Sequence, residues 1–292
     1  MLTDPRKLVT VDGEPITNLS PPLRSKVESI LNELQTCGKV LVAFSGGIDS
    51  TLMLYLAKLE LQSNAIAVTA NSPSLPTSEL QEAKKLAEEL NVNQIIVQTD
   101  ELADPNYTSN PSNRCYFCKK ELSQKLVALA EELGINSIMD GTNADDLQGH
   151  RPGAAALSER CIRRPLANFG VTKSEVRELS RIFKLPNSEK PSSPCLSSRV
   201  EYGQTITPEK LLRIEKSEQY IRSLINVNEL RVRDHGNLAR IEVDANERRL
   251  LFDEATLDKI GEALRKFGYT YVAFDVRGYR SGSMNELLKI KK

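Results

Sequence analysis

The sequence predicts an α/β protein built on a doubly wound parallel sheet, followed by a smaller α+β domain. Two observations carry this prediction. From about residue 40 to residue 146, short apolar segments rich in β-branched residues alternate with longer segments that have apolar residues at helical spacing. Polar turns also follow three of the apolar segments directly, at 45–50, 69–76 and 140–146. Ligands of doubly wound folds bind outside the carboxyl ends of the strands, so these turns mark one candidate site.

The elements of the first part follow from local patterns. Strands are expected at 40–44, 65–70, 94–98 and 137–139, and helices at 23–35, 51–60, 77–90, 119–133 and 172–184. The last of these helices starts with a capping-box pattern, in which Thr172 is followed three residues later by Glu175. Residues 1–22 contain four prolines and are predicted to form an extended arm.

The order of predicted elements changes after Pro208, where strands and helices no longer alternate strictly. A helix is expected at 208–225, strands at 229–234 and 239–243, a helix at 246–267 and a strand at 271–275. A chain of 292 residues is longer than one hydrophobic core comfortably supports. We therefore predict an arm at 1–22, a first domain at 23–205 and a C-terminal domain at 206–292.

The composition narrows the class of partner. Lys plus Arg and Asp plus Glu both number 39, and aromatic residues make up 5% with no Trp, so a nucleic-acid partner is not expected. No apolar run approaches the roughly 18 residues of a membrane span, and the N-terminus has no signal-peptide pattern. Five cysteines, an odd number, fit a reducing compartment. We expect a cytoplasmic protein with a small-molecule partner and no membrane.

The turn at 45–50 reads Ser-Gly-Gly-Ile-Asp-Ser between a buried strand and a helix. Gly46 and Gly47 let the backbone approach an anion closely, the helix start supplies N–H groups, and Ser45 and Ser50 add hydroxyls. No Gly-Lys-Ser/Thr follows, so the turn is not a Walker A loop. It resembles the PP-loop of the ATP pyrophosphatases, which split ATP into AMP and pyrophosphate while adenylating a substrate.

This resemblance implies an ATP site that extends over the neighbouring strand ends. Asp49 and Asp145 are candidate carboxylates for orienting Mg²⁺ and pyrophosphate, since ATP-bound Mg²⁺ needs only one or two protein carboxylates. The other strand-end residues are candidates for covering the nucleotide. The predicted nucleotide-binding residues are Ser45, Gly46, Gly47, Asp49, Ser50, Thr69, Asn71, Ser72, Gly141, Thr142, Asn143 and Asp145.

Cys115 and Cys118 form a Cys-x-x-Cys pair that permits three interpretations. A zinc site would need two more ligands from His150, His235, Cys37, Cys161 and Cys195. A redox dithiol is a second option, although the pair does not open a thioredoxin-like βαβ unit. An iron–sulfur cluster held by three thiolates is the third, with Cys195 as the natural third ligand because it lies in the Pro/Ser-rich linker near Arg199. Adenylation combined with nucleophilic sulfur points to a thiolation reaction.

The motifs taken together resemble the LarE family. They lie at 45–50, 69–76, 114–119, 140–146, 151–153, 194–199, 231–235 and 239–243. The resemblance implies an ATP-dependent sulfur transferase of nickel-pincer nucleotide biosynthesis, which serves lactate racemase. Its substrate would be pyridinium-3,5-biscarboxylic acid mononucleotide, whose carboxylate is adenylated with release of pyrophosphate. Sulfur then displaces AMP and leaves a thiocarboxylate.

The same resemblance implies further roles for individual residues. Arg199, Arg231 and Arg233 would bind the substrate phosphate or, alternatively, structural anions. Sulfur would come from Cys195 itself, which becomes dehydroalanine, or from sulfide on a [4Fe-4S] cluster held by Cys115, Cys118 and Cys195. Because all three cysteines are present, the cluster is the favoured hypothesis. Trimer-based homo-oligomers are typical of the family.

Other functions compete with this one. A PP-loop tRNA thiolase should show a basic domain or zinc knuckles, which the sequence lacks. An ammonia-dependent synthetase related to NAD synthetase would leave the three cysteines without a role. A non-enzymatic nucleotide-sensing module is the remaining alternative.

Overall fold

The computed structural model describes residues 8–147, 152–280 and 282–285 of the chain. The chain divides into two compact units. The first comprises residues 1–72, 77–99 and 116–193, and the second comprises 73–76, 100–115 and 194–292. The predicted boundary near residue 205 stays a prediction, and the compact units divide the chain between Ser193 and Pro194.

The first unit is built on a parallel sheet of four strands in the order β3-β2-β1-β4. The strands are β1 (Val40–Ala43), β2 (Ala65–Asn71), β3 (Asn93–Gln98) and β4 (Ile138–Asp140). The predicted doubly wound α/β class is thereby confirmed. The central strand β1 is fully buried from Val40 to Val42, as a strand covered on both faces should be.

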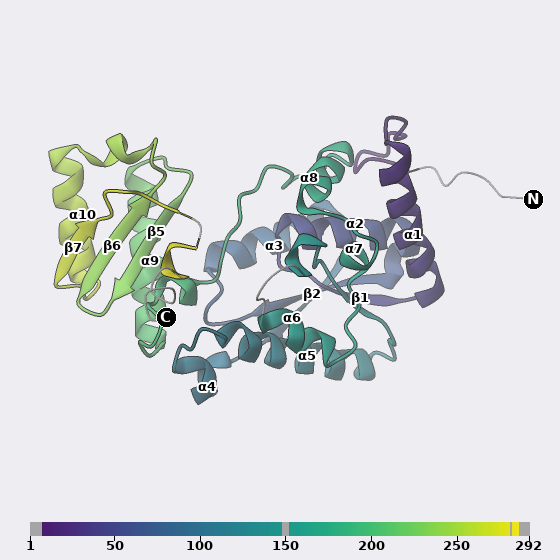
Figure 1. The fold of residues 1–292 in the computed structure, drawn as a ribbon, viewed down its shortest axis with the longest axis horizontal. Helices are drawn as coiled ribbons and strands as arrows, with labels where there is room; N and C mark the ends of the chain where they lie inside the picture. Colours follow the sequence, from purple (N-terminus) through teal and green to yellow (C-terminus); the bar gives the residue numbers. More distant parts are fainter. Residues whose placement is uncertain (1–7, 148–151, 281, 286–292) are drawn as a thin grey trace, which may run out of the picture. The chain divides into compact units, whose positions relative to one another are not determined.

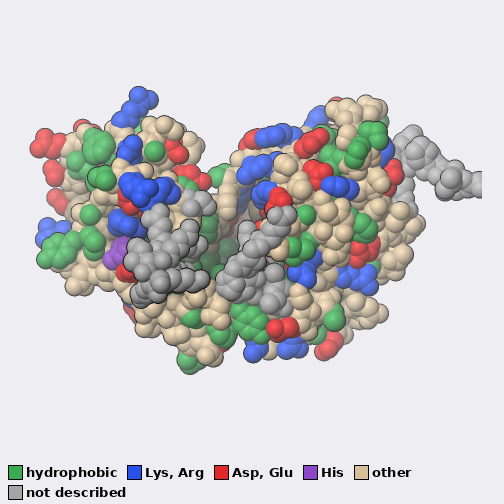
Figure 2. Space-filling model, viewed as in Figure 1, with side chains coloured by type: hydrophobic (Ala, Val, Ile, Leu, Met, Phe, Trp, Pro, Cys, Tyr) green, Lys and Arg blue, Asp and Glu red, His purple; other side chains and the backbone are tan. Residues whose placement is uncertain are grey.

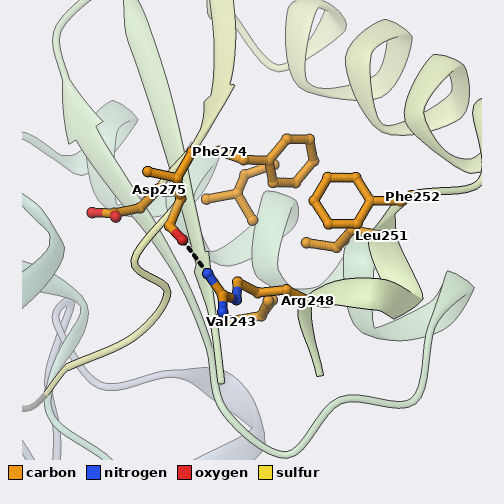
Figure 3. Close-up of a pocket in the computed structure, with 8 residues that line it drawn as sticks. Val243, Arg248, Leu251, Phe252, Phe274 and Asp275 are labelled. Carbon is orange, nitrogen blue, oxygen red and sulfur yellow. Dashed lines mark hydrogen bonds between the residues drawn. The ribbon is translucent and has the colours of Figure 1, made fainter. Parts of the chain in front are cut away.

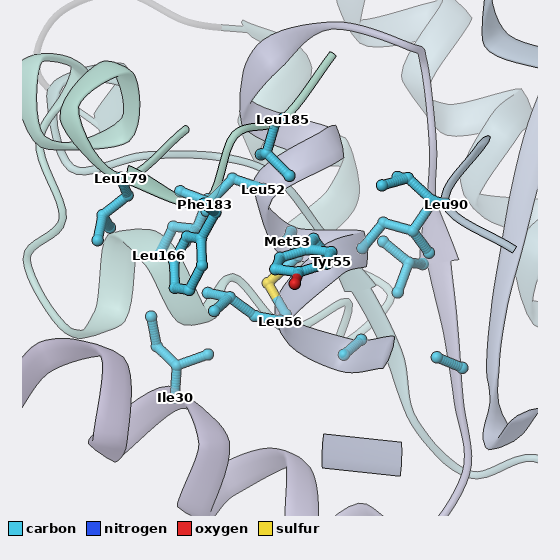
Figure 4. Packing of buried hydrophobic residues seen from close by; sticks show 14 of the residues in the cluster. Ile30, Leu52, Met53, Tyr55, Leu56, Leu90, Leu166, Leu179, Phe183 and Leu185 are labelled. Atoms are coloured by element: carbon cyan, nitrogen blue, oxygen red, sulfur yellow. The ribbon is translucent and has the colours of Figure 1, made fainter. Parts of the chain in front are cut away.

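Helices cover both faces of this sheet (Figure 1). One face carries α1 (Pro21–Cys37), α2 (Ile48–Leu61), α3 (Thr77–Glu89) and α8 (Lys173–Ile182), and the other carries α5 (Arg114–Glu132) and α6 (Pro152–Ser158). The α2 helix is buried almost all round because it packs between the sheet, α1 and α8. Figure 4 shows this packing, with Leu52 and Leu56 of α2 close to Phe183 and Leu166. The PP-loop therefore leads directly into a helix that is packed on several sides.

The second unit contains a three-stranded sheet in the order β5-β6-β7. Its strands are β5 (Leu230–His235), β6 (Leu238–Val243) and β7 (Tyr271–Phe274), and its main helices are α9 (Pro208–Leu224) and α10 (Glu254–Lys266). Both helices pack on the face that carries Val232 and Ile241. Because side chains alternate along a strand, Arg231, Arg233 and Glu242 belong to the opposite face.

Some predicted boundaries are wrong. The helix expected at 119–133 begins at Arg114, so Cys115 and Cys118 lie within its first five residues. The helix expected at 246–267 is divided into a 3₁₀ turn (Arg248–Leu251) and α10. The Asp253 side chain accepts a hydrogen bond from the Thr256 N–H and starts α10 there. The short helices α4 (Pro105–Thr108), α6 and α7 (Pro165–Asn168) were not predicted.

The described part of the N-terminal arm, residues 8–20, packs onto the first unit. Leu8, Ile16 and Leu19 are buried in its core, and the Tyr55 hydroxyl donates to the carbonyl of Val9. Residues 1–7 of the predicted arm lie outside the described residues. Within the described residues, no helix is both long enough and apolar enough to cross a membrane.

Acidic and basic side chains are mixed over the surface of both units on the face seen in Figure 2. This mixture agrees with the equal numbers of basic and acidic residues in the sequence.

Candidate active site

The PP-loop closes on itself between β1 and α2. The Ser50 hydroxyl accepts from the Ser45 N–H at 3.2 Å and donates to the Gly47 carbonyl at 3.0 Å. Gly46 has φ +71°, and a Cβ atom added to it would lie 3.1 Å from the Cβ of Ala83 on α3. A side chain at this position would therefore meet both backbone strain and a packed helix. The loop conformation that the sequence predicts needs glycine here.

Two residues that were not predicted contact the Gly46 carbonyl of the PP-loop. The buried Asn187 amide donates to the Gly46 carbonyl and to the Thr51 hydroxyl, both at 2.9 Å. The Lys190 ammonium lies 3.5 Å from the same carbonyl and pairs with Glu79 at 2.8 Å. Both residues come from the linker that follows α8. The start of this linker is thus hydrogen-bonded to the PP-loop.

Asp49 is held by one lysine and one amide. Its Oδ2 atom lies 2.5 Å from Lys173 Nζ, and its Oδ1 atom accepts from Asn143 Nδ2 at 3.0 Å. The backbone N–H of Lys173 donates to Asp145 Oδ2 at 2.7 Å. The structure therefore brings the predicted residues Asp49, Asn143 and Asp145 together around Lys173, which was not predicted.

Lys173 owes its position to the capping box that the sequence predicted. Thr172 accepts from the Glu175 N–H at 3.3 Å, and Glu175 accepts from the Thr172 N–H at 2.8 Å, so α8 begins at Lys173. The starts of α2 and α8 therefore meet at Asp49. The positive ends of two helix dipoles favour an anion at this place.

The turn after β4 packs directly onto the start of α2. A Cβ atom added to Gly141 would lie 2.6 Å from the backbone nitrogen of Ser50, which no real side chain tolerates. The Thr142 N–H donates to Asp140 Oδ1 at 2.7 Å and fixes the turn. Gly141 thus lies beside the PP-loop, and the binding of the nucleotide by Gly141 and Thr142 stays a prediction.

The predicted residues at the end of β2 make contacts inside the sheet. The buried Thr69 hydroxyl donates to the Phe44 carbonyl at 2.7 Å and accepts from the Gln94 amide at 2.8 Å. Asn71 donates to Gln98 at 3.0 Å. Ser72 ends the same segment of the first unit. A role for these residues in binding adenine stays a prediction.

Cys195 lies in the second unit, at the start of a short 3₁₀ turn (Leu196–Arg199). The Arg199 guanidinium donates to the Cys195 carbonyl at 3.0 Å and to the Pro194 carbonyl. The same side chain, only 2% exposed, forms two hydrogen bonds with the Glu218 carboxylate at 3.0 and 3.1 Å. Arg199 thereby ties the backbone of the cysteine segment to α9.

The other two predicted phosphate ligands lie in the same unit. Arg233 pairs with Glu242 at 2.7 Å and donates to the Ser198 carbonyl at 3.0 Å. Arg231 pairs with Glu229 at 3.1 Å. Burial, followed by repulsion from Arg199, lowers the pKa of Arg231. Each of the three arginines is thus paired with a glutamate of the same unit, and their binding of phosphate stays a prediction.

Asp49 and Asp145 supply carboxylate oxygens of the kind that suits Mg²⁺ with phosphate oxygens and waters as its other ligands, and this binding stays a prediction. Among residues 8–147, 152–280 and 282–285, no three His, Cys, Asp or Glu side chains are grouped so that they could hold a metal ion. Cys115 and Cys195 belong to the second unit and Cys118 to the first, and the binding of a [4Fe-4S] group by these cysteines stays a prediction. His150 and Arg151 lie outside the described residues.

A small cavity of about 240 Å³ lies elsewhere in the second unit. Leu251, Phe252 and Phe274 line it, and the Arg248 guanidinium donates to the Val276 carbonyl at its edge (Figure 3). None of the predicted nucleotide, phosphate or metal ligands lines this cavity.

Comparison with known proteins agrees with this geometry. The NAD synthase family profile matches residues 22–115, which include the PP-loop. The chain is 36% identical to pyridinium-3,5-bisthiocarboxylic acid mononucleotide synthase of Lactiplantibacillus plantarum over 91% of its own length and 96% of that protein. The chain belongs to the LarE family.

LarE membership confirms the predicted class of enzyme, an ATP-using sulfurtransferase with a PP-loop. The chain is also 45% identical to an uncharacterised protein of Synechocystis sp., over 91% of this chain and 99% of that protein. An uncharacterised protein of Methanocaldococcus jannaschii is 30% identical over 88% of this chain and 96% of its own length. The LarE pattern thus extends over both compact units.

Proposed function

We propose that this LarE protein converts a carboxylate of pyridinium-3,5-biscarboxylic acid mononucleotide into a thiocarboxylate at the expense of ATP. The similarity to the Lactiplantibacillus plantarum synthase over nearly the whole chain carries the proposal, because that protein is named for the bisthiocarboxylic acid product. The anion site around Asp49 and Lys173 supports the first half of the reaction. The segment that carries Cys195 supports the second half.

The first half activates the carboxylate. A carboxylate oxygen of the substrate attacks the α-phosphorus of ATP, and the bond to the β-phosphate oxygen breaks. Pyrophosphate leaves with the bonding electron pair. The N–H groups of the PP-loop and the Lys173 ammonium offset the charge that develops on this leaving group. Mg²⁺ held by Asp49 and Asp145 would add charge neutralisation on the phosphate oxygens.

The second half transfers sulfur. A sulfur nucleophile attacks the carbonyl carbon of the acyl adenylate, the carbon–oxygen bond breaks, and AMP leaves with the electron pair. If the nucleophile is Cys195 itself, a thioester forms. Loss of the Cα proton then breaks the Cβ–Sγ bond and leaves dehydroalanine and the thiocarboxylate. Arg231 and Arg233, with Arg199, are the proposed ligands of the substrate phosphate.

The alternative source of sulfur is sulfide on a [4Fe-4S] cluster, for which Cys115, Cys118 and Cys195 would be the ligands. We retain this as the favoured hypothesis from the sequence. Anaerobic purification followed by iron and sulfide analysis tests it. A colourless, iron-free protein in which Cys195 alone loses sulfur during turnover would exclude the cluster. We also propose that the protein acts in the cytoplasm as a trimer-based homo-oligomer.

Pyrophosphate release tests the function as a whole. The protein is incubated with ATP and the pyridinium biscarboxylate nucleotide, and parallel reactions contain tRNA, or ammonia with the adenylated precursor of NAD. We expect pyrophosphate only with the pyridinium nucleotide, together with a thiocarboxylate product in mass spectra. Release that depends on tRNA or ammonia would establish one of the rival functions instead.

A further inference from the structure

Four buried polar side chains of the second unit form a chain that the proposed chemistry does not use. The Ser74 hydroxyl donates to the Glu101 carboxylate at 2.5 Å, and the Tyr107 and Ser197 hydroxyls lie 2.6 Å apart. Ser74 is a further polar neighbour of the Tyr107 hydroxyl, so the two pairs adjoin. All four residues are at most 2% exposed.

The Ser74 hydroxyl donates to the Glu101 carboxylate, and either hydroxyl of the Tyr107 and Ser197 pair can be the donor. Buried hydrogen bonds of this kind hold their members in one arrangement, whereas an apolar core of the same volume would tolerate several.

The end of this chain lies next to the cysteine segment. Ser197 is two residues after Cys195, and the Leu196 N–H between them donates to the Ser74 carbonyl at 2.8 Å. Burial raises the pKa of Tyr107, so the phenol stays a neutral hydroxyl.

We propose that Tyr107 is a positioning residue for Cys195, a role that rests on the proposed function and assigns a task within it. The chain from Glu101 to Ser197 holds one side of the cysteine segment, while Arg199 and Glu218 hold the other side. The two attachments together fix the direction of the Cys195 thiol. Burying a carboxylate and three hydroxyls costs free energy compared with an apolar core, and what the network gives in return is one defined arrangement of the segment beside Cys195.

Tyr107→Phe tests the proposal because it removes only the hydroxyl. Misplacement of a reacting group by a remote change costs on the order of 10- to 100-fold in rate, and we expect a loss in this range for thiocarboxylate formation in a single turnover. Pyrophosphate release should stay unchanged, since it depends on the first unit. Ser197→Ala should give the same loss, and the double variant should be no slower than either single variant, because both break one chain.

Tyr269→Phe is the matched control. Tyr269 is also buried in the second unit, and its hydroxyl donates to Asp234 at 3.0 Å. We expect Tyr269→Phe to leave sulfur transfer unchanged. A loss in Tyr269→Phe equal to that in Tyr107→Phe, or an equal loss of pyrophosphate release in Tyr107→Phe, would overturn the positioning role.

A second readout does not depend on the reaction at all. Iodoacetamide alkylation of each cysteine is followed by peptide mass spectrometry, with the exposed Cys161 as the internal reference. Cys195 is half-buried, so a segment loosened by Tyr107→Phe should be alkylated several-fold faster, while the rate at Cys161 is unchanged. Equal rates at Cys195 in wild type and Tyr107→Phe would overturn the inference. Failure of the wild type to form thiocarboxylate would instead overturn the proposed function.

Discussion

The ammonium of Lys173 lies 2.5 Å from the carboxylate of Asp49, and this contact joins the starts of the two helices that border the PP-loop. Both helix starts present positive dipole ends. The side chain of Lys173 is 37% exposed, so the pair is open to ligand from solvent. A triphosphate entering this site would compete with Asp49 for the ammonium. Under the proposed function, the pair holds Lys173 at the place where pyrophosphate charge develops.

Replacing Lys173 by Met should slow pyrophosphate release by about 100-fold, the usual cost of removing one preorganised group from a developing negative charge. The loss should appear mainly in kcat, because the charge on pyrophosphate grows in the transition state. Stopped assays of pyrophosphate at saturating ATP measure it. Lys85→Met is the control, since Lys85 is 76% exposed and pairs with Glu89 of its own helix. Equal kcat values in Lys173→Met and wild type would refute this role.

A methyl group at residue 141 should abolish ATP binding. The Cβ of Gly141→Ala would lie 2.6 Å from the backbone nitrogen of Ser50, so the β4 turn or the start of α2 must move. Either movement displaces N–H groups of the PP-loop. Isothermal titration with ATP checks this, alongside circular dichroism to show that the fold is retained.

The same change at Gly261 should leave ATP binding unchanged and stabilise the protein. Gly261 lies within α10, and a Cβ atom there would meet no heavy atom within 4 Å. Gly261→Ala should raise the unfolding free energy by about 1 kcal/mol, the difference in helix propensity. Thermal unfolding measures it, and ATP affinity should not change. Weaker ATP binding in Gly261→Ala would mean that the Gly141 effect is not specific.

These residues also show how far sequence reasoning reaches. Apolar periodicity fixed the order of strands and helices because burial dictates it locally, and the capping box marked the start of α8 correctly. The helix start at Arg114 was not predicted, and the Arg114 side chain makes a contact there that no local pattern reveals. The Arg114 guanidinium donates to Asn110 and stacks on Tyr202, which is far away in the sequence.

The candidate site divides in the same way. Gly46 and Asp49 belong to a continuous motif, so their spacing alone pointed to a phosphate loop. Lys173, Asn187 and Tyr107 reach their partners across 124, 141 and 90 residues. A single lysine, asparagine or tyrosine carries no local pattern, and only the fold reveals its partner.

Lowering the pH should reduce the contribution of Glu175 to the unfolding free energy. Burial alone would raise its pKa, but hydrogen bonds from Lys26 and Thr172 outweigh burial and lower the pKa below the ordinary value of 4.5. A carboxyl whose pKa is depressed by folding stabilises the protein fully above its unfolded pKa and loses that contribution as the pH falls through the folded pKa. The stability difference between wild type and Glu175→Gln should therefore be constant above about pH 5 and shrink below pH 4.5. Urea unfolding at a series of pH values measures it, and a difference that grows on acidification would contradict the assignment.

Substitutions in the ion pair of Arg199 and Glu218 can distinguish a structural role of Arg199 from a role in binding phosphate. Both side chains are buried, and Glu218 also accepts from the Val232 N–H at 3.0 Å. Removing only one partner leaves a buried charge uncompensated, so Arg199→Met should lower the unfolding free energy by about 3–5 kcal/mol. Arg199→Met combined with Glu218→Gln should recover much of that stability, because the buried carboxylate is gone. Chemical unfolding compares the three proteins, and titration with the pyridinium nucleotide follows on the double variant. Affinity restored together with stability means that Arg199 acts through the fold, whereas a stable double variant that still fails to bind assigns Arg199 to the substrate phosphate.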